Sequence, residues 1–261
     1  MVKKLLKHEL IALFRVLVFF MIAVVVFTAL GRLLIWHLVS QDGDATTTAI
    51  MLTVFVMMFY VFAIYALTIG AYVLGCVRFY KTLFKGEGYM TLSLPATPTQ
   101  IIWAKLLASL IGVVSAAFVS GISMVILFVG WEDFPIMEVI FELFASIDLS
   151  FLGFSGWMYI IEAILLGIAV FPMSLLIVYA VISVGQSFTS YRVFLTFVIL
   201  VGVYFVLNMI STISFIPLMT LAVEVSPHLM IWAYIIAVCG LDVGSFFLIR
   251  YMLTNKVNLV A

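Results

Sequence analysis

The sequence predicts an all-α membrane protein with six transmembrane helices and both termini on the cytoplasmic side. Three observations lead to this fold class. Of the 261 residues, 67% are hydrophobic and 9% are charged, which is about a third of the charged share of a soluble domain. Apolar runs recur at lengths that cross a bilayer, and the charges between them are sorted by sign. The core of one soluble domain cannot hold so many apolar residues. They must therefore face lipid and each other.

Six apolar runs reach the roughly 20 helical residues that a bilayer core about 30 Å thick requires. The first run follows Lys3, Lys4 and Lys7, as the core of a signal peptide would, but it is too long and no cleavage motif of small residues follows it. Residues 16–30 are apolar on every side, whereas the strands of outer-membrane barrels alternate. We therefore predict a helical bundle. Its spans are residues 10–38, 50–77, 101–130, 156–184, 193–215 and 229–251.

The distribution of charge predicts the orientation. With the amino terminus in the cytoplasm, eleven of the twelve Lys and Arg residues fall on the cytoplasmic side, and Arg32 is the exception. Eight of the twelve acidic residues fall in the outer loops. Because cytoplasmic loops are enriched in Lys and Arg, this bias favours six spans with both termini inside.

Three segments outside the spans have a character of their own. Residues 1–14 predict a helix that lies in the membrane interface, and a simple positive flank of the first span is the alternative. Residues 131–155 should form an extracellular amphipathic segment, in which residues 135–148 predict a helix on the outer leaflet. Residues 213–228 are apolar but carry Pro217 and Pro227, which should break the chain and favour a re-entrant outer segment.

The segment between the second and third spans, residues 79–100, is the most informative. In residues 79–85 the apolar and the basic side chains fall on different faces of a helix. This spacing predicts a short amphipathic helix that ends at Gly86 and Gly88. The segment is too small for a catalytic domain. A short structured loop of this kind is a feature that a soluble partner can grip.

The sequence lacks the motifs of common enzymes. It contains no GxxxxGK[ST], HExxH or GxSxG, and His8, His37 and His228 are spread over both predicted membrane faces. Cys76 and Cys239 lie inside apolar runs without the spacing of a metal or redox site. Twelve basic residues balance twelve acidic ones, so no basic excess is present to bind nucleic acid. We expect no catalytic, cofactor-binding or metal site in this chain, and hence no enzyme.

Three ionisable residues, Arg32, Glu162 and Asp242, lie at depth inside predicted spans, where a charge costs roughly 2.5 to 3.5 kcal/mol. Arg32 and Glu162 both lie about 10 Å below the outer surface, at about 1.5 Å per residue. We therefore predict an ion pair between them, and the alternative is that Arg32 reaches outward alone. Asp242 lies deeper, and Gly240 and Gly244 form a small-residue pair on nearly the opposite face of its helix.

Three stretches of the sequence resemble bacterial ABC-2-type transporter permeases, the six-span membrane subunits that are encoded apart from their ATPase. They are KKLLKHELIALFR at residues 3–15, GEGYMTLSLPATPTQIIWAKLL at residues 86–107 and RYMLTNKVNL at residues 250–259. The stretch from Glu87 to Pro95 is the most specific of these motifs. Together with the pattern of spans, the resemblance covers the whole chain.

The resemblance implies an ABC-2 architecture, like that of type V exporters, in the bacterial plasma (inner) membrane. Two permease subunits, identical or different, would pair among the membrane lipids, and cytoplasmic ABC ATPase subunits would bind ATP and Mg below them. Residues 1–14 would be the interfacial elbow helix, and residues 213–228 the outer re-entrant element. The cargo would be a drug, an antimicrobial peptide or a lipid. The coupling segment, residues 79–100, would contact the ATPase through Phe79, Tyr80, Lys81, Leu83, Phe84 and Glu87.

A second hypothesis is an ATP-independent secondary transporter or channel that uses Glu162 or Asp242 as its coupling site. Such a protein would be expected to contain an inverted internal repeat. The first three and last three spans share no motif, and the charged loop after the second span has no counterpart after the fifth. The sequence therefore favours the exporter subunit.

Overall fold

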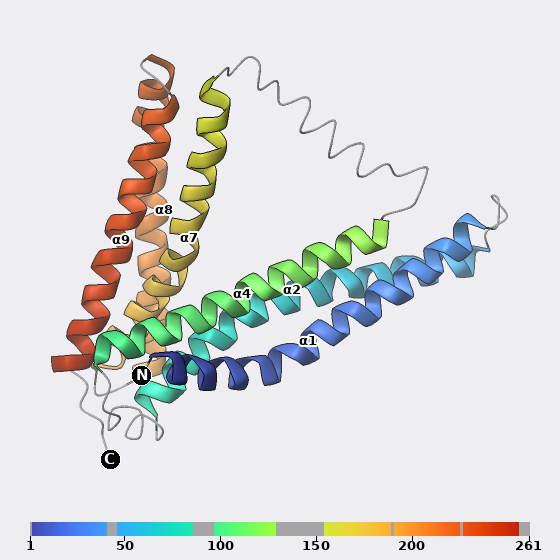
Figure 1. Ribbon diagram of the computed structural model, residues 1–261, viewed down its shortest axis with the longest axis horizontal. Helices are drawn as coiled ribbons and strands as arrows, with labels where there is room; N and C mark the ends of the chain where they lie inside the picture. The colour runs from blue at the N-terminus through green and yellow to red at the C-terminus, as the bar shows by residue number, and fades with distance from the viewer. Residues whose placement is uncertain are drawn as a thin grey trace. The chain divides into compact units, whose positions relative to one another are not determined.

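A computed structural model describes residues 2–40, 46–85, 97–128, 154–188, 191–224 and 227–255. Within these ranges the chain forms six long helices (Figure 1), each with a stretch long and apolar enough to cross a membrane. The prediction of an all-α chain with six helices of membrane length is confirmed for the described residues. The helices are α1 (Val2–Val39), α2 (Thr47–Phe84), α4 (Pro98–Phe128), α7 (Phe154–Gly185), α8 (Arg192–Glu224) and α9 (Pro227–Asn255).

Two helices begin at a proline. Pro98 opens α4 and Pro227 opens α9, and proline suits this position because its missing N–H is one that the first turn does not use. The backbone N–H of Thr97 donates to the side-chain oxygen of Gln100 at 3.4 Å, which satisfies a donor that the helix leaves free. The start of α4 is thus fixed by local chemistry.

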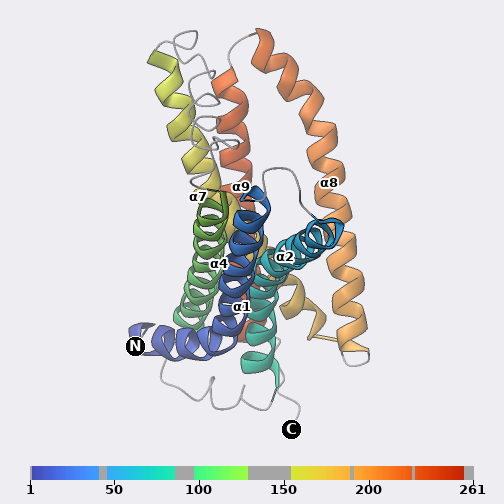
Figure 2. The same cartoon turned by 90° about the vertical axis from the view of Figure 1, so that its right-hand side faces the viewer.

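Two predicted segments are continuous with neighbouring spans. Residues 2–14 belong to α1, which runs without interruption to Val39 and bends near its amino-terminal end (Figure 2). Residues 79–84 form the end of α2 and not a separate helix, because no glycine or proline interrupts the run from the apolar span into this amphipathic turn. Residues 86–96 lie outside the described residues, as do residues 129–153, which hold most of the predicted outer amphipathic segment.

The break predicted at Pro217 is wrong. Helix α8 continues to Glu224 with Pro217 inside it, and α7 likewise contains Pro172. A proline removes one backbone donor, and apolar helices tolerate this loss where neighbouring groups satisfy the freed carbonyl. The predicted re-entrant segment, residues 213–228, is therefore helical as far as Glu224, and α9 begins at Pro227.

The chain divides into two compact units. The amino-terminal unit comprises residues 6–75 and 108–148, and the carboxy-terminal unit comprises residues 1–5, 76–107 and 149–261. Helices α2 and α4 contribute to both units. The carboxy-terminal unit thus holds α7, α8 and α9 together with the two helix ends that flank residues 85–97.

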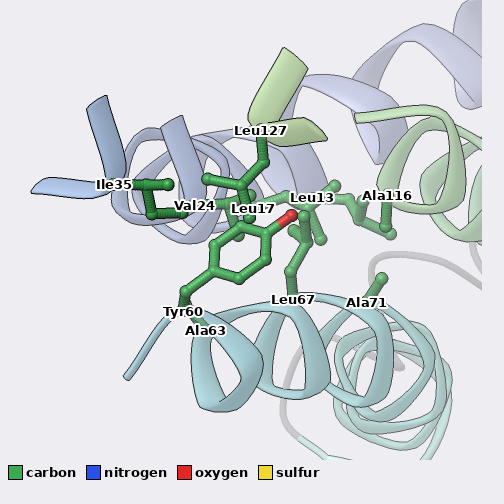
Figure 3. Packing of buried hydrophobic residues seen from close by; sticks show 10 residues of the cluster. All are labelled: Leu13, Leu17, Val24, Ile35, Tyr60, Ala63, Leu67, Ala71, Ala116 and Leu127. Carbon is green, nitrogen blue, oxygen red and sulfur yellow. The ribbon is translucent and has the colours of Figure 1, made fainter. Parts of the chain in front are cut away.

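The core of the amino-terminal unit lies among α1, α2 and α4. Figure 3 shows its buried side chains, which come from all three helices and point toward one another. The hydroxyl groups of Tyr60 and Ser123 are 2.8 Å apart and join α2 to α4 inside this apolar cluster. The cluster consists of Leu13, Leu17, Val24, Ile35, Tyr60, Ala63, Leu67, Ala71, Ala116 and Leu127.

In the carboxy-terminal unit α7 packs most extensively on α9, and α8 contacts both helices less. Helices α7 and α9 begin at the same end of this unit, and α8, which lies between them in the sequence, runs in the opposite direction (Figures 1 and 2). The end of α2 joins α7 through the rings of Phe79 and Tyr179, which stack at 3.9 Å with an interplanar angle of 4°. The start of α4 joins α9 through Trp103 and Phe246, whose ring centroids are 5.6 Å apart.

We predict that Gly75→Ala destabilises the amino-terminal unit. A Cβ atom at Gly75 would lie 2.6 Å from Oγ and 2.9 Å from Cβ of Ser109, so α2 and α4 would have to separate, at a cost of about 1 to 3 kcal/mol. Unfolding in detergent should show this loss.

Two further variants serve as controls. Adding Ser109→Gly to Gly75→Ala makes room for the new methyl group and should restore part of the stability. Gly121→Ala in α4 meets no atom within 4 Å and should leave stability unchanged or raise it. An equal effect of Gly75→Ala and Gly121→Ala would contradict the close approach of α2 and α4.

Candidate functional site

A buried acidic residue pairs with a histidine between α7 and α9. The Glu162 side chain is 2% exposed, and its Oε2 atom lies 2.9 Å from Nδ1 of His228, whose side chain is 21% exposed. The His228 ring stacks on that of Tyr159, with centroids 4.2 Å apart and an interplanar angle of 16°. Three side chains with polar or ionisable groups therefore meet near the end at which α7 and α9 begin.

Local sequence places each of these residues. Tyr159 and Glu162 are three positions apart, so they lie on one face of α7. Pro227 begins α9 and puts His228 in its first turn. The amino-terminal end of a helix carries a partial positive charge, which favours a nearby carboxylate and disfavours an imidazolium by about 0.3 to 1 kcal/mol each.

Direct contact outweighs this helix effect. Two opposite charges about 4 Å apart attract each other by on the order of 4 kcal/mol at an effective dielectric constant of about 20. The contact between Glu162 and His228 is shorter than that. A pair of opposite charges at this contact would therefore gain more from mutual attraction than the end of the helix costs it.

The carboxyl group of Glu162 is not fully satisfied. Its Oε1 atom is buried and has no hydrogen-bond partner among the described residues, and the same holds for Oδ1 of Asp242. A buried polar atom without a partner costs about 1 to 3 kcal/mol. The buried carboxyl group of Glu162 therefore lowers the stability of the fold. Because packing alone does not explain why such a residue is present, Glu162 is a candidate functional residue.

Arg32 has a role that its sequence position did not reveal. Its guanidinium donates to the backbone carbonyl of Ile126, in the last turn of α4. The last carbonyls of a helix have no partner within the helix and carry partial negative charge, so a cation stabilises them. This contact gives the single basic residue on the predicted outer side a reason to be there.

The ion pair predicted between Arg32 and Glu162 would join the two units. Within its own unit each residue has another partner: Arg32 contacts the Ile126 carbonyl, and Glu162 contacts His228. The pair between the two units stays a prediction. His228 was not predicted, although Pro227 and His228 directly precede an apolar run that begins on the predicted side of Glu162.

The predicted small-residue pair of α9 does not pack within the described chain. Gly240 and Gly244 are exposed, and a Cβ atom at either would meet open space. Cys76 and Cys239 are free thiols. Among the residues that the structure describes, no group of three or more His, Cys, Asp or Glu side chains is placed to hold a metal ion.

The residues predicted to contact an ATPase divide into two sets. Phe79 and Leu83 are buried in the carboxy-terminal unit, so in this fold they position the end of α2 and do not present a surface. Tyr80 and Phe84 are half-buried and Lys81 is exposed. Glu87 lies outside the described residues.

A buried lysine that the sequence analysis did not single out ties the flanks of this segment together. Lys105 on α4 is 3% exposed, and its ammonium group donates to the hydroxyl of Thr82 on α2. Thr82 in turn donates to the backbone carbonyl of Arg78 at 2.6 Å. A charged group is seldom buried unless it is hydrogen-bonded, so this contact fixes the spacing between the two helix ends.

Comparison of the chain with protein-family models, with curated proteins and with solved structures finds no match.

We predict that Arg32→Ala destabilises the protein by about 1 to 2 kcal/mol, because the end of α4 loses a charged donor. Comparison with Glu162→Ala tests the predicted ion pair, because the losses of two residues that do not interact add. Unfolding of the two single variants and of the double variant measures this sum. A double variant much more stable than the sum would support the ion pair between Arg32 and Glu162 instead.

Proposed function

We propose that the chain is the membrane-spanning permease subunit of an ATP-binding-cassette exporter of the ABC-2 type. It would form the cargo pathway as a homodimer or heterodimer, driven by a separate ATPase that supplies the bound ATP and Mg. Six helices of membrane length support this proposal, as do the absence of a GxxxxGK[ST] motif from the sequence and the resemblance of residues 86–107 to the coupling region of such permeases.

One observation carries the proposal furthest. Both helix ends that flank residues 85–97 are built into the unit that contains α7, α8 and α9. The Phe79–Tyr179 stack joins one end to α7, and the contact of Trp103 with Phe246 joins the other to α9. Because packed interiors transmit displacement with little compression, a protein that grips this segment would move these helices with it.

The hydrogen bond of Lys105 with Thr82 adds to this coupling. It holds the end of α2 and the start of α4 at a fixed spacing, so the segment between them is anchored on both sides. A loop anchored at both ends passes on a push or a pull, whereas a loose linker absorbs it. The proposed contact with the ATPase narrows to Tyr80, Lys81 and Phe84, with Glu87 from the segment beyond, while Phe79 and Leu83 act inside the permease.

The proposal also covers the membrane in which the chain lies, its second subunit and its cargo. The resemblance to ABC-2 permeases implies the bacterial inner membrane, and the distribution of charge favours both termini in the cytoplasm. No residue of the most apolar part of α8 is buried within one chain, which leaves its faces free for lipid or for a second permease subunit. A drug, an antimicrobial peptide or a lipid is the proposed class of cargo.

Purification of the tagged protein from its native membrane in mild detergent tests the proposal. Mass spectrometry of the eluate should find a P-loop ATPase in amounts comparable to the permease, and the eluate should hydrolyse ATP. The same mass spectra show whether one or two permease species are present. A stable oligomer that carries no ATPase would contradict the exporter subunit and favour a secondary transporter.

We predict that Lys81→Glu weakens the binding of the ATPase by about tenfold or more, because it reverses an exposed charge at the proposed contact. Phe79→Leu, by contrast, should leave binding intact and lower cargo-stimulated ATP hydrolysis, since it removes the stack with Tyr179 inside the permease. Co-purification measures the first effect, and ATPase assays in liposomes measure the second.

Phe62→Leu is the matched control, because Phe62 lies on the same helix with its side chain exposed. It should change neither property. If Phe79→Leu and Phe62→Leu behave alike, the Phe79–Tyr179 stack does not transmit the movement.

A further inference from the structure

We propose that Glu162 and His228 form a proton-binding site that joins α7 to α9 more tightly when it is occupied. This inference does not depend on the ATPase partner, because it concerns only the chain itself. It begins from a buried carboxyl group that touches a partly exposed imidazole within a segment apolar enough to cross a membrane.

Burial limits what Glu162 can bind. Its side chain is 2% exposed, and its Oε1 atom is enclosed without a partner among the described residues. A metal ion, an amine or an anionic group needs room that a close-packed helix pair does not give, whereas a proton needs none. The proton is therefore the ligand that this geometry accepts.

His228 supplies the path for that proton. Its Nδ1 atom faces the carboxylate at 2.9 Å, so its Nε2 atom is the nitrogen left to exchange protons with the surroundings. The imidazole is about a fifth exposed while the carboxyl group is sealed. A proton that binds at Nε2 changes the charge of the whole pair without any opening of the space around Glu162.

The two states differ in how strongly they hold the helices. Without the proton, a neutral imidazole donates one hydrogen bond to a buried carboxylate, which keeps an unbalanced negative charge. With the proton, an imidazolium faces the carboxylate, the pair becomes neutral, and the same hydrogen bond is assisted by both charges. Since a buried single charge is far more costly than a buried pair, proton uptake strengthens the link between α7 and α9.

Few other acidic or basic groups lie on the described parts of α7, α8 and α9. Tyr159 stacks on the His228 ring from α7. On α9, Asp242 lies fourteen positions beyond His228, roughly 21 Å along the helix, and Arg250 lies near the carboxy-terminal end. On α8, Arg192 is the first residue and Glu224 is the last. The response of the pair is therefore identified by comparison with variants that lack it.

Thermal unfolding of the full chain in nanodiscs of phosphatidylcholine and phosphatidylglycerol tests the proposal. Between about pH 8 and about pH 5.5, which bracket the ordinary titration of histidine, the midpoint of the wild type should rise. A tenfold difference in proton affinity between folded and unfolded chains gives about 2 to 5 °C. The rise should be smaller than in the wild type in Glu162→Gln and in His228→Gln, and it should keep its full size in His37→Gln, which removes a histidine from the last turn of α1.

A second measurement does not rely on unfolding. The chain has three histidines, so nitrogen NMR of ¹⁵N-histidine in His8→Gln, His37→Gln protein reports His228 alone. Replacement of Glu162 by Gln should lower the proton affinity of His228 by about tenfold or more, which is about 1.4 kcal/mol, whereas Tyr159→Phe should leave it unchanged. If Glu162→Gln leaves the titration of His228 unaltered, or if both pair variants keep the full pH response of the wild type, the proposal is overturned.

Discussion

The structure depends on one constraint, that a backbone amide or carbonyl without a partner costs several kcal/mol in hydrocarbon. A chain with 67% hydrophobic residues that lies in a membrane must therefore satisfy its backbone within continuous helices. This constraint explains why the apolar stretch of each helix is unbroken. The helices α1 and α2 also include residues 2–14 and 79–84, because no glycine or proline interrupts these ends. The constraint also explains why Pro217 stays inside α8, since the loss of one hydrogen bond costs less than a broken helix does. Among the described residues, polar contacts join helices at several places.

Three of these polar contacts lie where helices must be held in a fixed relation. Lys105 with Thr82 fixes the helix ends on either side of residues 85–97, and Arg32 closes the end of α4 through the carbonyl of Ile126. Glu162 with His228 joins α7 to α9. The proposed permease would use the first contact to receive movement and would use the packing of Phe79 on Tyr179 to pass it on. The third contact offers a place where the proton concentration can alter the same helices.

The fold could be predicted from sequence further than the site could. Apolar runs and sorted charges predicted six helices because both properties are local and repeated along the chain. The end of α2 was mispredicted as a separate helix because amphipathic spacing does not show whether a turn continues a span. Partners distant in sequence left still less signal: nothing at Glu162 pointed to His228, and nothing at Phe79 indicated that Tyr179 would cover it. A side chain that is half of a buried contact and one that awaits a partner protein look alike in a sequence.

The central claim is that the region between α2 and α4 docks a nucleotide-hydrolysing partner. Site-specific photo-crosslinking in the native membrane tests it most directly, with the crosslinker placed at Lys81 and, for comparison, at the exposed Phe62 within the same helix. We expect the group at position 81 to capture a P-loop ATPase and the group at position 62 to capture none. Capture of no ATPase at position 81, in membranes where the chain is present and folded, would contradict the account.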